Sequence, residues 1–157
     1  YGGLYHWYPS VTGRMLDDTL GQIHFWITFV GTYLIYFPMH YIGFLGVPRR
    51  YYSNEQYDFI PQSVNDLNQF ITICALIVGA SQFILLYNFV VSLYKGKEAG
   101  PNPWGACTLE WQALESPPGH GNWGEKLPVV YRWPYDYGLP GATADFVPQN
   151  VPDEQIT

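Results

Sequence analysis

Two long stretches without a charged side chain constrain what this chain can fold into. Residues 23–45 and residues 70–94 contain no Asp, Glu, Lys or Arg over 23 and 25 positions. As helices they would be about 34 and 38 Å long, at about 1.5 Å per residue. A hydrocarbon core is about 30 Å thick. The sequence therefore predicts an all-α membrane protein with two full transmembrane helices, at residues 20–45 and 67–95.

The composition agrees with a chain that is only partly exposed to water. Aromatic residues make up 18% and charged residues 13%, whereas soluble domains average about 25% charged residues. The net charge of -6 and the lack of a basic stripe argue against nucleic acid as a partner. Cys74 and Cys107 have no metal-ligand spacing, and we predict no disulfide between them.

The segments before and between the two stretches are predicted as connections. Residues 1–9 are apolar and aromatic and are interpreted as the end of a preceding helix that closes at Pro9, so we expect the chain to start partway through something larger. Residues 10–19 form a connection, with Gly13 as the turn residue and Asp17, Asp18 and Thr19 as helix-start candidates. Residues 46–66 form an extended loop with aromatic side chains suited to a membrane interface, namely Tyr51, Tyr52, Tyr57 and Phe59.

Several residues inside the predicted helices indicate packing against neighbours. Gly31 allows a second helix to approach closely, and Pro38 predicts a kink. Asn65 and Asp66 are predicted to cap the second helix. Its polar side chains are interpreted as interhelical hydrogen-bond partners rather than site residues, namely Thr72, Ser81, Gln82, Asn88 and Ser92.

Residues 96–157 have a different composition. They hold nine of the 13 prolines, so they cannot form long helices. Four tryptophans are spread along them, at Trp104, Trp111, Trp123 and Trp133. We predict an extended tail that lies as a strap on partner surfaces.

Two adjacent arginines, Arg49 and Arg50, follow Pro48 at the end of the first stretch. Pro48 disfavours helix before it, so we expect extended backbone with diverging side chains. Guanidinium groups bind carboxylates or phosphates in a bidentate manner. The pair could bind two specific anions, or it could reach lipid phosphates, and the residues alone favour the lipid interpretation.

The histidines do not form a metal site by spacing. His24 and His40 are sixteen residues apart, about 24 Å along a helix, so they cannot share one metal ion. We interpret each as a packed, hydrogen-bonded side chain. His6 and His120 have no companion ligands at a useful spacing.

Three segments together resemble a known family. HFWITFVGTYLIYFPMHYIGFLGVPRRYY resembles the penultimate membrane helix and following loop of subunit I of the cytochrome c oxidases, the catalytic subunit of the haem–copper oxidases. GGLYHWYPSVTGRMLDDT resembles the connection before that helix, and NPWGACTLEWQALESPPGHGNW resembles the tail after the last helix. The resemblance covers residues 1 to about 123, with Tyr36 in place of a Phe.

This resemblance implies a structure and a site. The chain would be the C-terminal portion of the subunit, with the last two helices of a twelve-helix bundle, the loop at 46–66 on the outer side and the tail at 96–157 on the inner side. Arg49 and Arg50 would contact the propionates of the haem a groups. Asp18 and His24 match a possible proton route, although Ile35 stands where a Thr is expected. The haem and copper ligands would belong to the remainder of the enzyme, so this chain would hold no catalytic or metal-binding residue.

The resemblance also implies a function. The whole enzyme would reduce O2 to water with electrons from cytochrome c, or from a quinol, and would move protons across the mitochondrial inner membrane or a bacterial cytoplasmic membrane. Its partners would be the N-terminal portion of subunit I and other oxidase subunits. The alternative is a small two-helix accessory or assembly subunit without cofactor contact.

Overall fold

The computed structural model describes residues 1–50, 52–53, 57–112, 123, 127–137, 141 and 144–155. Tyr51, His120 and most of the SPPGHGNW motif lie outside these residues. The chain divides into two compact units, one formed by Asp17–Val91 and the other by Tyr1–Leu16 with Ser92–Thr157. Each unit is described by itself.

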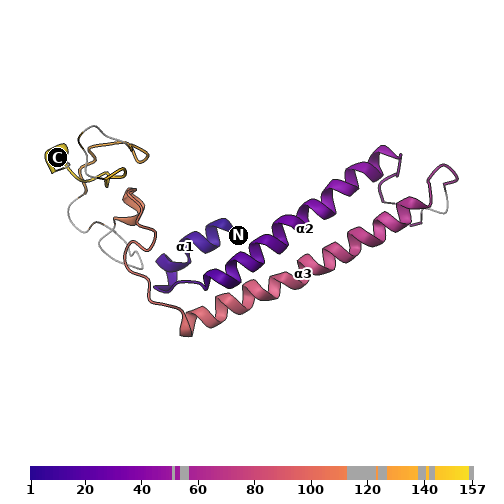
Figure 1. Ribbon diagram of the computed structural model, residues 1–157, viewed down its shortest axis with the longest axis horizontal. Helices are drawn as coiled ribbons and strands as arrows, with labels where there is room; N and C mark the ends of the chain where they lie inside the picture. The colour runs from indigo at the N-terminus through magenta and orange to yellow at the C-terminus, as the bar shows by residue number, and fades with distance from the viewer. Residues whose placement is uncertain are drawn as a thin grey trace. The chain divides into compact units, whose positions relative to one another are not determined.

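The first unit is a helical hairpin. Helix α2 spans Asp18–Phe44 and helix α3 spans Ser63–Lys95, and the two run antiparallel side by side (Figure 1). Asp17 is the N-cap of α2, and its side chain accepts a hydrogen bond from the Leu20 backbone N–H at 2.9 Å, as expected for an aspartate at this position. The helix continues through Pro38 to Phe44.

Helix α3 begins earlier than the sequence predicted. The backbone N–H groups of Val64 and Asn65 donate to the carbonyls of Pro61 and Gln62 at 3.0 and 2.9 Å, which starts the first turn at Ser63 rather than at residue 67. Asn65 and Asp66 therefore lie inside the first turn and are not caps. Val64 is only 1% exposed, so its burial stabilises this earlier start.

The two helices contact each other closely near their middle. A Cβ atom built on Gly31 would lie 2.2 Å from Cγ2 of Val78, a distance at which no side chain fits. Gly31 therefore allows the close approach that the sequence predicted. Toward the end of α2, Ile42, Val64 and Ile71 form a buried apolar cluster, and Ile35, Leu45, Val47, Ile60 and Leu67 pack against it.

Within the described residues, α3 is the one helix that is both long and apolar enough to cross a membrane. Helix α2 has 27 residues, but Tyr, Trp and His interrupt its apolar positions. Such side chains prefer the membrane interface to the hydrocarbon. Both helices also expose large apolar side chains, for example Phe37 at 75% and Phe83 at 72%.

The second unit begins with helix α1, Gly2–Thr12. We expected the helix to close at Pro9, and this was wrong. Proline lacks an N–H and its ring crowds the carbonyl four residues earlier, but its φ suits a helix. The residues after it can still donate hydrogen bonds, so the chain completes one more turn. The Gly13 N–H then donates to the Pro9 carbonyl at 2.8 Å, and Gly13 ends the helix at a φ of 70°, a left-handed conformation that glycine adopts readily.

The segment after α1 pairs with the chain that follows α3. The Met15 N–H donates to the Lys97 carbonyl at 2.7 Å, and the Ala99 N–H donates to the Gly13 carbonyl at 2.9 Å. The Arg14 guanidinium donates to the Gly96 carbonyl at 2.8 Å. Two segments about 80 residues apart in sequence are thereby joined by backbone pairing.

The described part of the tail has only short helical turns, η2 at Leu109–Trp111 and η3 at Asp153–Gln155. It is not simply extended, however, because Gln149 joins three of its segments. Its side chain accepts from the Leu109 N–H at 3.0 Å and donates to the Arg132 carbonyl at 3.1 Å, and its backbone N–H donates to the Cys107 carbonyl at 3.1 Å. Buried Arg132 also pairs with Asp153 at 2.6 Å. The tail therefore has internal contacts that the proline count did not predict.

Candidate functional site

The loop after α2 is shaped by a glycine and a proline. Gly46 has a φ of 82°, and its N–H donates to the Gly43 carbonyl at 3.1 Å. This left-handed residue ends the helix, because only glycine reaches such a φ without strain. A Cβ atom on Gly46 would lie 3.4 Å from the Phe59 ring, so the loop folds close to that aromatic side chain. Pro48 then leads directly into Arg49 and Arg50.

Both arginines are exposed. Within the described residues neither guanidinium forms an ion pair. The expectation of extended backbone was wrong for Arg50, which has a φ of 61°. A non-glycine residue in this left-handed region is uncommon and costs free energy. Arg49 and Arg50, called the Arg pair below, are therefore two exposed cations at a turn of the backbone rather than residues of an extended strand.

His24 is deeply buried, with 1% of its surface exposed. Its Nε2 atom lies 3.3 Å from Oε1 of Gln82, and the Gln82 amide donates to the Val78 carbonyl at 2.9 Å. The Gln82 amide also lies 3.5 Å from the Thr28 hydroxyl. His24 is thus a packed side chain in an interhelical polar contact, as the sequence predicted.

Asn88 joins α3 to the start of α2. Its side-chain oxygen accepts from the Asp17 N–H at 3.0 Å, and its side-chain nitrogen donates to the Asp17 carbonyl at 2.9 Å. Ser81 lies 3.4 Å from Thr28, also across the helices. The Thr72 hydroxyl instead donates to the Asn68 carbonyl of its own helix at 2.8 Å. The interhelical prediction is therefore confirmed for Ser81, Gln82 and Asn88 and was wrong for Thr72, whose hydroxyl bonds within α3.

The structure does not bring Asp18 and His24 together. Asp18 is exposed in the first turn of α2, whereas His24 is buried, and six residues separate them, about 9 Å along the helix. Ile35, where the resemblance expects a Thr, packs against the apolar cluster of the hairpin. An isoleucine has no hydrogen-bonding group to pass a proton.

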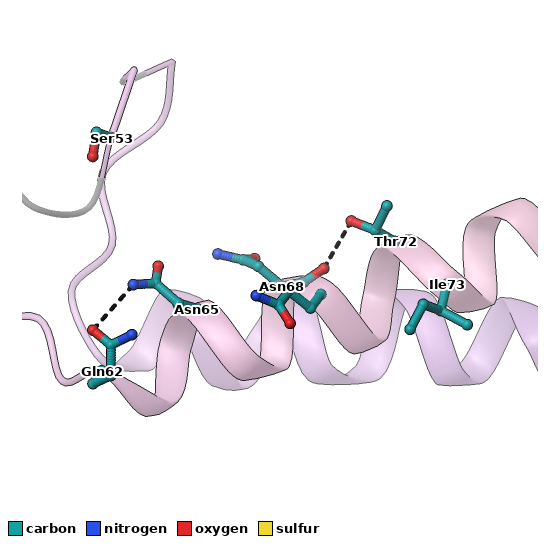
Figure 2. A pocket seen from close by; sticks show the side chains of 7 residues that line it. Ser53, Gln62, Asn65, Asn68, Thr72 and Ile73 are labelled. Atoms are coloured by element: carbon teal, nitrogen blue, oxygen red, sulfur yellow. Dashed lines mark hydrogen bonds between the residues drawn. The ribbon is translucent and has the colours of Figure 1, made fainter.

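A groove at the start of α3 was not predicted from the sequence. Its volume is about 630 Å³, and its lining side chains (Figure 2) are those of Ser53, Gln62, Asn65, Asn68, Gln69, Thr72 and Ile73. We call it the amide groove. A signal for it was present, because Gln62, Asn65, Gln69 and Thr72 recur at the spacing of one helix face.

The second unit contains an aromatic cluster that sequence reasoning also missed. The His6 ring stacks on Trp104 at 5.9 Å and meets Trp111 edge-on at 5.1 Å. The Trp104 indole N–H donates to the His6 carbonyl at 3.1 Å, and the Trp7 indole donates to the Glu110 carboxylate. His6 therefore has aromatic companions rather than ligand companions. These contacts attach the first residues of the tail to α1.

The free thiols contribute no further chemistry to this site. Cys74 is buried and Cys107 is partly buried, and both are unpaired with each other. Among the described residues no group of three His, Cys, Asp or Glu side chains could hold a metal ion. The Arg pair therefore remains the candidate site for an external anion in the loop between α2 and α3.

Comparison with known proteins identifies the class to which this helical chain belongs. The family model "Cytochrome C and Quinol oxidase polypeptide I" matches residues 1–77. The chain is 62% identical over 151 residues to an alternative cytochrome c oxidase subunit 1 of Bradyrhizobium diazoefficiens, which covers 96% of this chain and 26% of that relative. It is 48% identical over 139 residues to a cytochrome c oxidase subunit 1 of Thermostichus vulcanus, and the match covers 88% of this chain and 24% of that relative.

A more distant relative belongs to the same class. A haem–copper oxidase subunit I+III of Aeropyrum pernix is 41% identical over 128 residues, covering 82% of this chain and 15% of that relative. The chain is thus a membrane-protein sequence of the haem–copper oxidase class. It belongs to the cytochrome c and quinol oxidase polypeptide I family, and it spans about a quarter of the length of the first two relatives.

Proposed function

We propose that this chain supplies the Arg pair and the α2–α3 hairpin to the catalytic subunit of a haem–copper oxidase. The whole enzyme would reduce O2 to water with electrons from cytochrome c or a quinol, and would move protons across the membrane. The observation that supports this proposal is the exposed Arg pair at the mouth of the hairpin, in a chain that is 62% identical to an oxidase subunit.

The Arg pair fits a haem group by its chemistry. Haem propionates are carboxylates, and a guanidinium donates two parallel hydrogen bonds to a carboxylate. Within the described residues no carboxylate forms an ion pair with Arg49 or Arg50, so no described carboxylate competes with an external anion for them. The left-handed φ of Arg50, 61°, fits a functional position, because such strain tends to occur at binding sites.

The role of the Arg pair would be electrostatic. When bound, the haem groups carry electrons, and one of them acts with copper in the reduction of oxygen. Arg49 and Arg50 would orient the propionates and lower the pKa of these carboxyl groups, because a nearby positive charge favours the ionised form. The same positive charge would favour the electron-rich state of a nearby haem.

The hairpin would hold the Arg pair at one membrane surface. We propose that α2 and α3 both cross the bilayer, with the remainder of subunit I and other oxidase subunits covering part of their exposed apolar side chains and lipid covering the rest. The proposal does not include a proton route through Asp18 and His24, because Ile35 lies in the apolar cluster. The accessory-subunit alternative is not retained, because the relatives are oxidase subunits.

The test is the double variant Arg49→Ala and Arg50→Ala in the assembled oxidase. Hydrogen bonds to charged groups contribute about 1.5–3 kcal/mol each, so we expect a lower haem midpoint potential and altered haem absorption. Lys97→Ala is the control, since this exposed cation lies far along the sequence from the pair. Unchanged potentials and spectra in the double variant, at normal haem content, would contradict the proposal.

A further inference from the structure

The side chains that line the amide groove have no part in the proposed contact between the Arg pair and haem. Asn68 lies on α3 in the same groove as Gln62 (Figure 2). Gln69 also lines this groove. Each carboxamide carries two donors and one acceptor oxygen. The Asn65 amide already donates to the Gln62 oxygen at 3.3 Å, which leaves the Gln62 nitrogen to serve as a donor. The groove therefore offers several neutral hydrogen-bonding groups within one hollow of about 630 Å³.

The position of the groove along α3 indicates a ligand with one polar end and one apolar end. This step rests on the proposed membrane crossing. Helix α3 has 33 residues and is about 50 Å long, which exceeds the hydrocarbon thickness of about 30 Å. Its apolar run starts at Phe70, so Gln62–Gln69 fall at the depth of the lipid headgroups. Ile73, which is 57% exposed, continues the groove toward the hydrocarbon.

The charges at the groove distinguish between headgroups. Among the described residues no lysine or arginine lines it, so an anionic headgroup would find no cation in the described lining. Asp66 does not line the groove, but it is exposed on α3 three residues before Gln69, a spacing that places residues on one side of a helix. A carboxylate at this position attracts a cation and repels a second anion.

We propose that the amide groove binds a phospholipid with a zwitterionic, ammonium-bearing headgroup. The side-chain amides of Gln62, Asn68 and Gln69 donate hydrogen bonds to the phosphodiester oxygens. Asp66 accepts from the ammonium group, and the acyl chains pass over Ile73 and Phe70, which is 42% exposed. The site consists of these side chains and does not depend on the helix terminus.

The first experiment measures lipid retention by the assembled oxidase. The enzyme is delipidated, incubated with vesicles of equal parts phosphatidylethanolamine and phosphatidylglycerol, purified again and analysed by native mass spectrometry. We expect the wild type to retain phosphatidylethanolamine, and the variant Asn68→Leu with Gln69→Leu to retain about tenfold less. The control Gln22→Leu removes an exposed amide from α2 and leaves retention unchanged.

A second variant tests whether the Asp66 charge selects the ammonium headgroup, without disturbing the fold of the site. Asp66→Asn preserves the shape of the side chain and removes its charge, so we expect the preference for phosphatidylethanolamine over phosphatidylglycerol to disappear while total lipid retention persists. Equal retention of both lipids by the wild type would overturn the proposal, as would an unaffected Asn68→Leu and Gln69→Leu variant. A photo-crosslinker at Gln69 that attaches to a polypeptide instead of lipid would also overturn it.

These outcomes are distinct from those of the haem test. The lipid variants lie at the start of α3, and their haem spectra and midpoint potentials serve as the folding readout. A loss of lipid preference with normal haem properties supports the groove alone. Normal lipid retention with altered haem potentials in the Arg49→Ala and Arg50→Ala enzyme supports only the proposed function.

Discussion

The two ends of the α2–α3 hairpin are held together by different interactions. Where α2 begins, Asn88 exchanges two hydrogen bonds with the Asp17 backbone. Where α2 ends, Ile42, Val64 and Ile71 form a buried apolar cluster. Hydrogen bonds are directional, whereas apolar burial is not. The polar end therefore fixes the register of the helices, and the apolar end holds the loop of the Arg pair through apolar contacts.

Between these ends lies the closest contact, at Gly31. Membrane helices associate through close packing at small residues and through hydrogen bonds that contribute about 0.6 kcal/mol on average. Steric fit at Gly31 should therefore matter more than either end. Three substitutions test this order, and each is best measured as a shift in the denaturation midpoint of the assembled oxidase.

The largest effect is expected from Gly31→Ala. The new Cβ would lie 2.2 Å from Cγ2 of Val78, and the branched valine has little rotamer freedom to move away. We expect a loss of about 3 kcal/mol, the upper range for overpacking. Gly43→Ala is the control: a Cβ there meets nothing within 4 Å, so a gain of about 0.5–1 kcal/mol is expected from helix propensity. A loss of equal size at both glycines would show that the close contact is not decisive.

The next effect is expected from Asn88→Leu. This side chain is 1% exposed, and its removal leaves the Asp17 N–H without its acceptor. Asp17 is exposed, so the cost is that of the two lost hydrogen bonds, about 0.5–1.5 kcal/mol each, and we expect a loss of about 2 kcal/mol. Thr32→Val removes a hydroxyl that donates to its own helix at Thr28, 2.6 Å away, and should have a much smaller effect. If both variants behave alike, directional contacts do not distinguish the two ends.

The smallest effect is expected from Ile71→Val at the apolar end. Ile71 is 6% exposed, and an isoleucine-to-valine change in a core costs about 0.5–1.5 kcal/mol, so we expect about 1 kcal/mol. Ile73→Val is matched in chemistry, but this side chain is 57% exposed and should give almost no change. A larger loss for Ile71→Val than for Asn88→Leu would reverse the comparison between the two ends.

Local signals in the sequence predicted part of the fold. The N-cap at Asp17, the turn at Gly13 and the close approach at Gly31 each follow from one residue type whose preference is strong. The sequence placed the start of α3 at residue 67, because Asn65 and Asp66 are good caps. Burial of Val64 moved this start to Ser63.

Other features depend on residues far apart in the chain. The sequence treated His6 as isolated, because its ring partners Trp104 and Trp111 lie about 100 positions away. The tail network around Gln149 joins Cys107, Leu109 and Arg132 in the same way. No periodicity within a window of ordinary length could predict such contacts.

By itself, the sequence determined the class of this protein: two uncharged stretches that form long helices, and an arginine pair beside the first. Only the tertiary structure decided that Arg50 takes a left-handed backbone, that His24 is buried against Gln82, and that four polar residues of α3 line one groove. The physical reason is the range of the interactions. Helix formation depends on neighbours within a few residues, whereas burial depends on which distant surfaces meet.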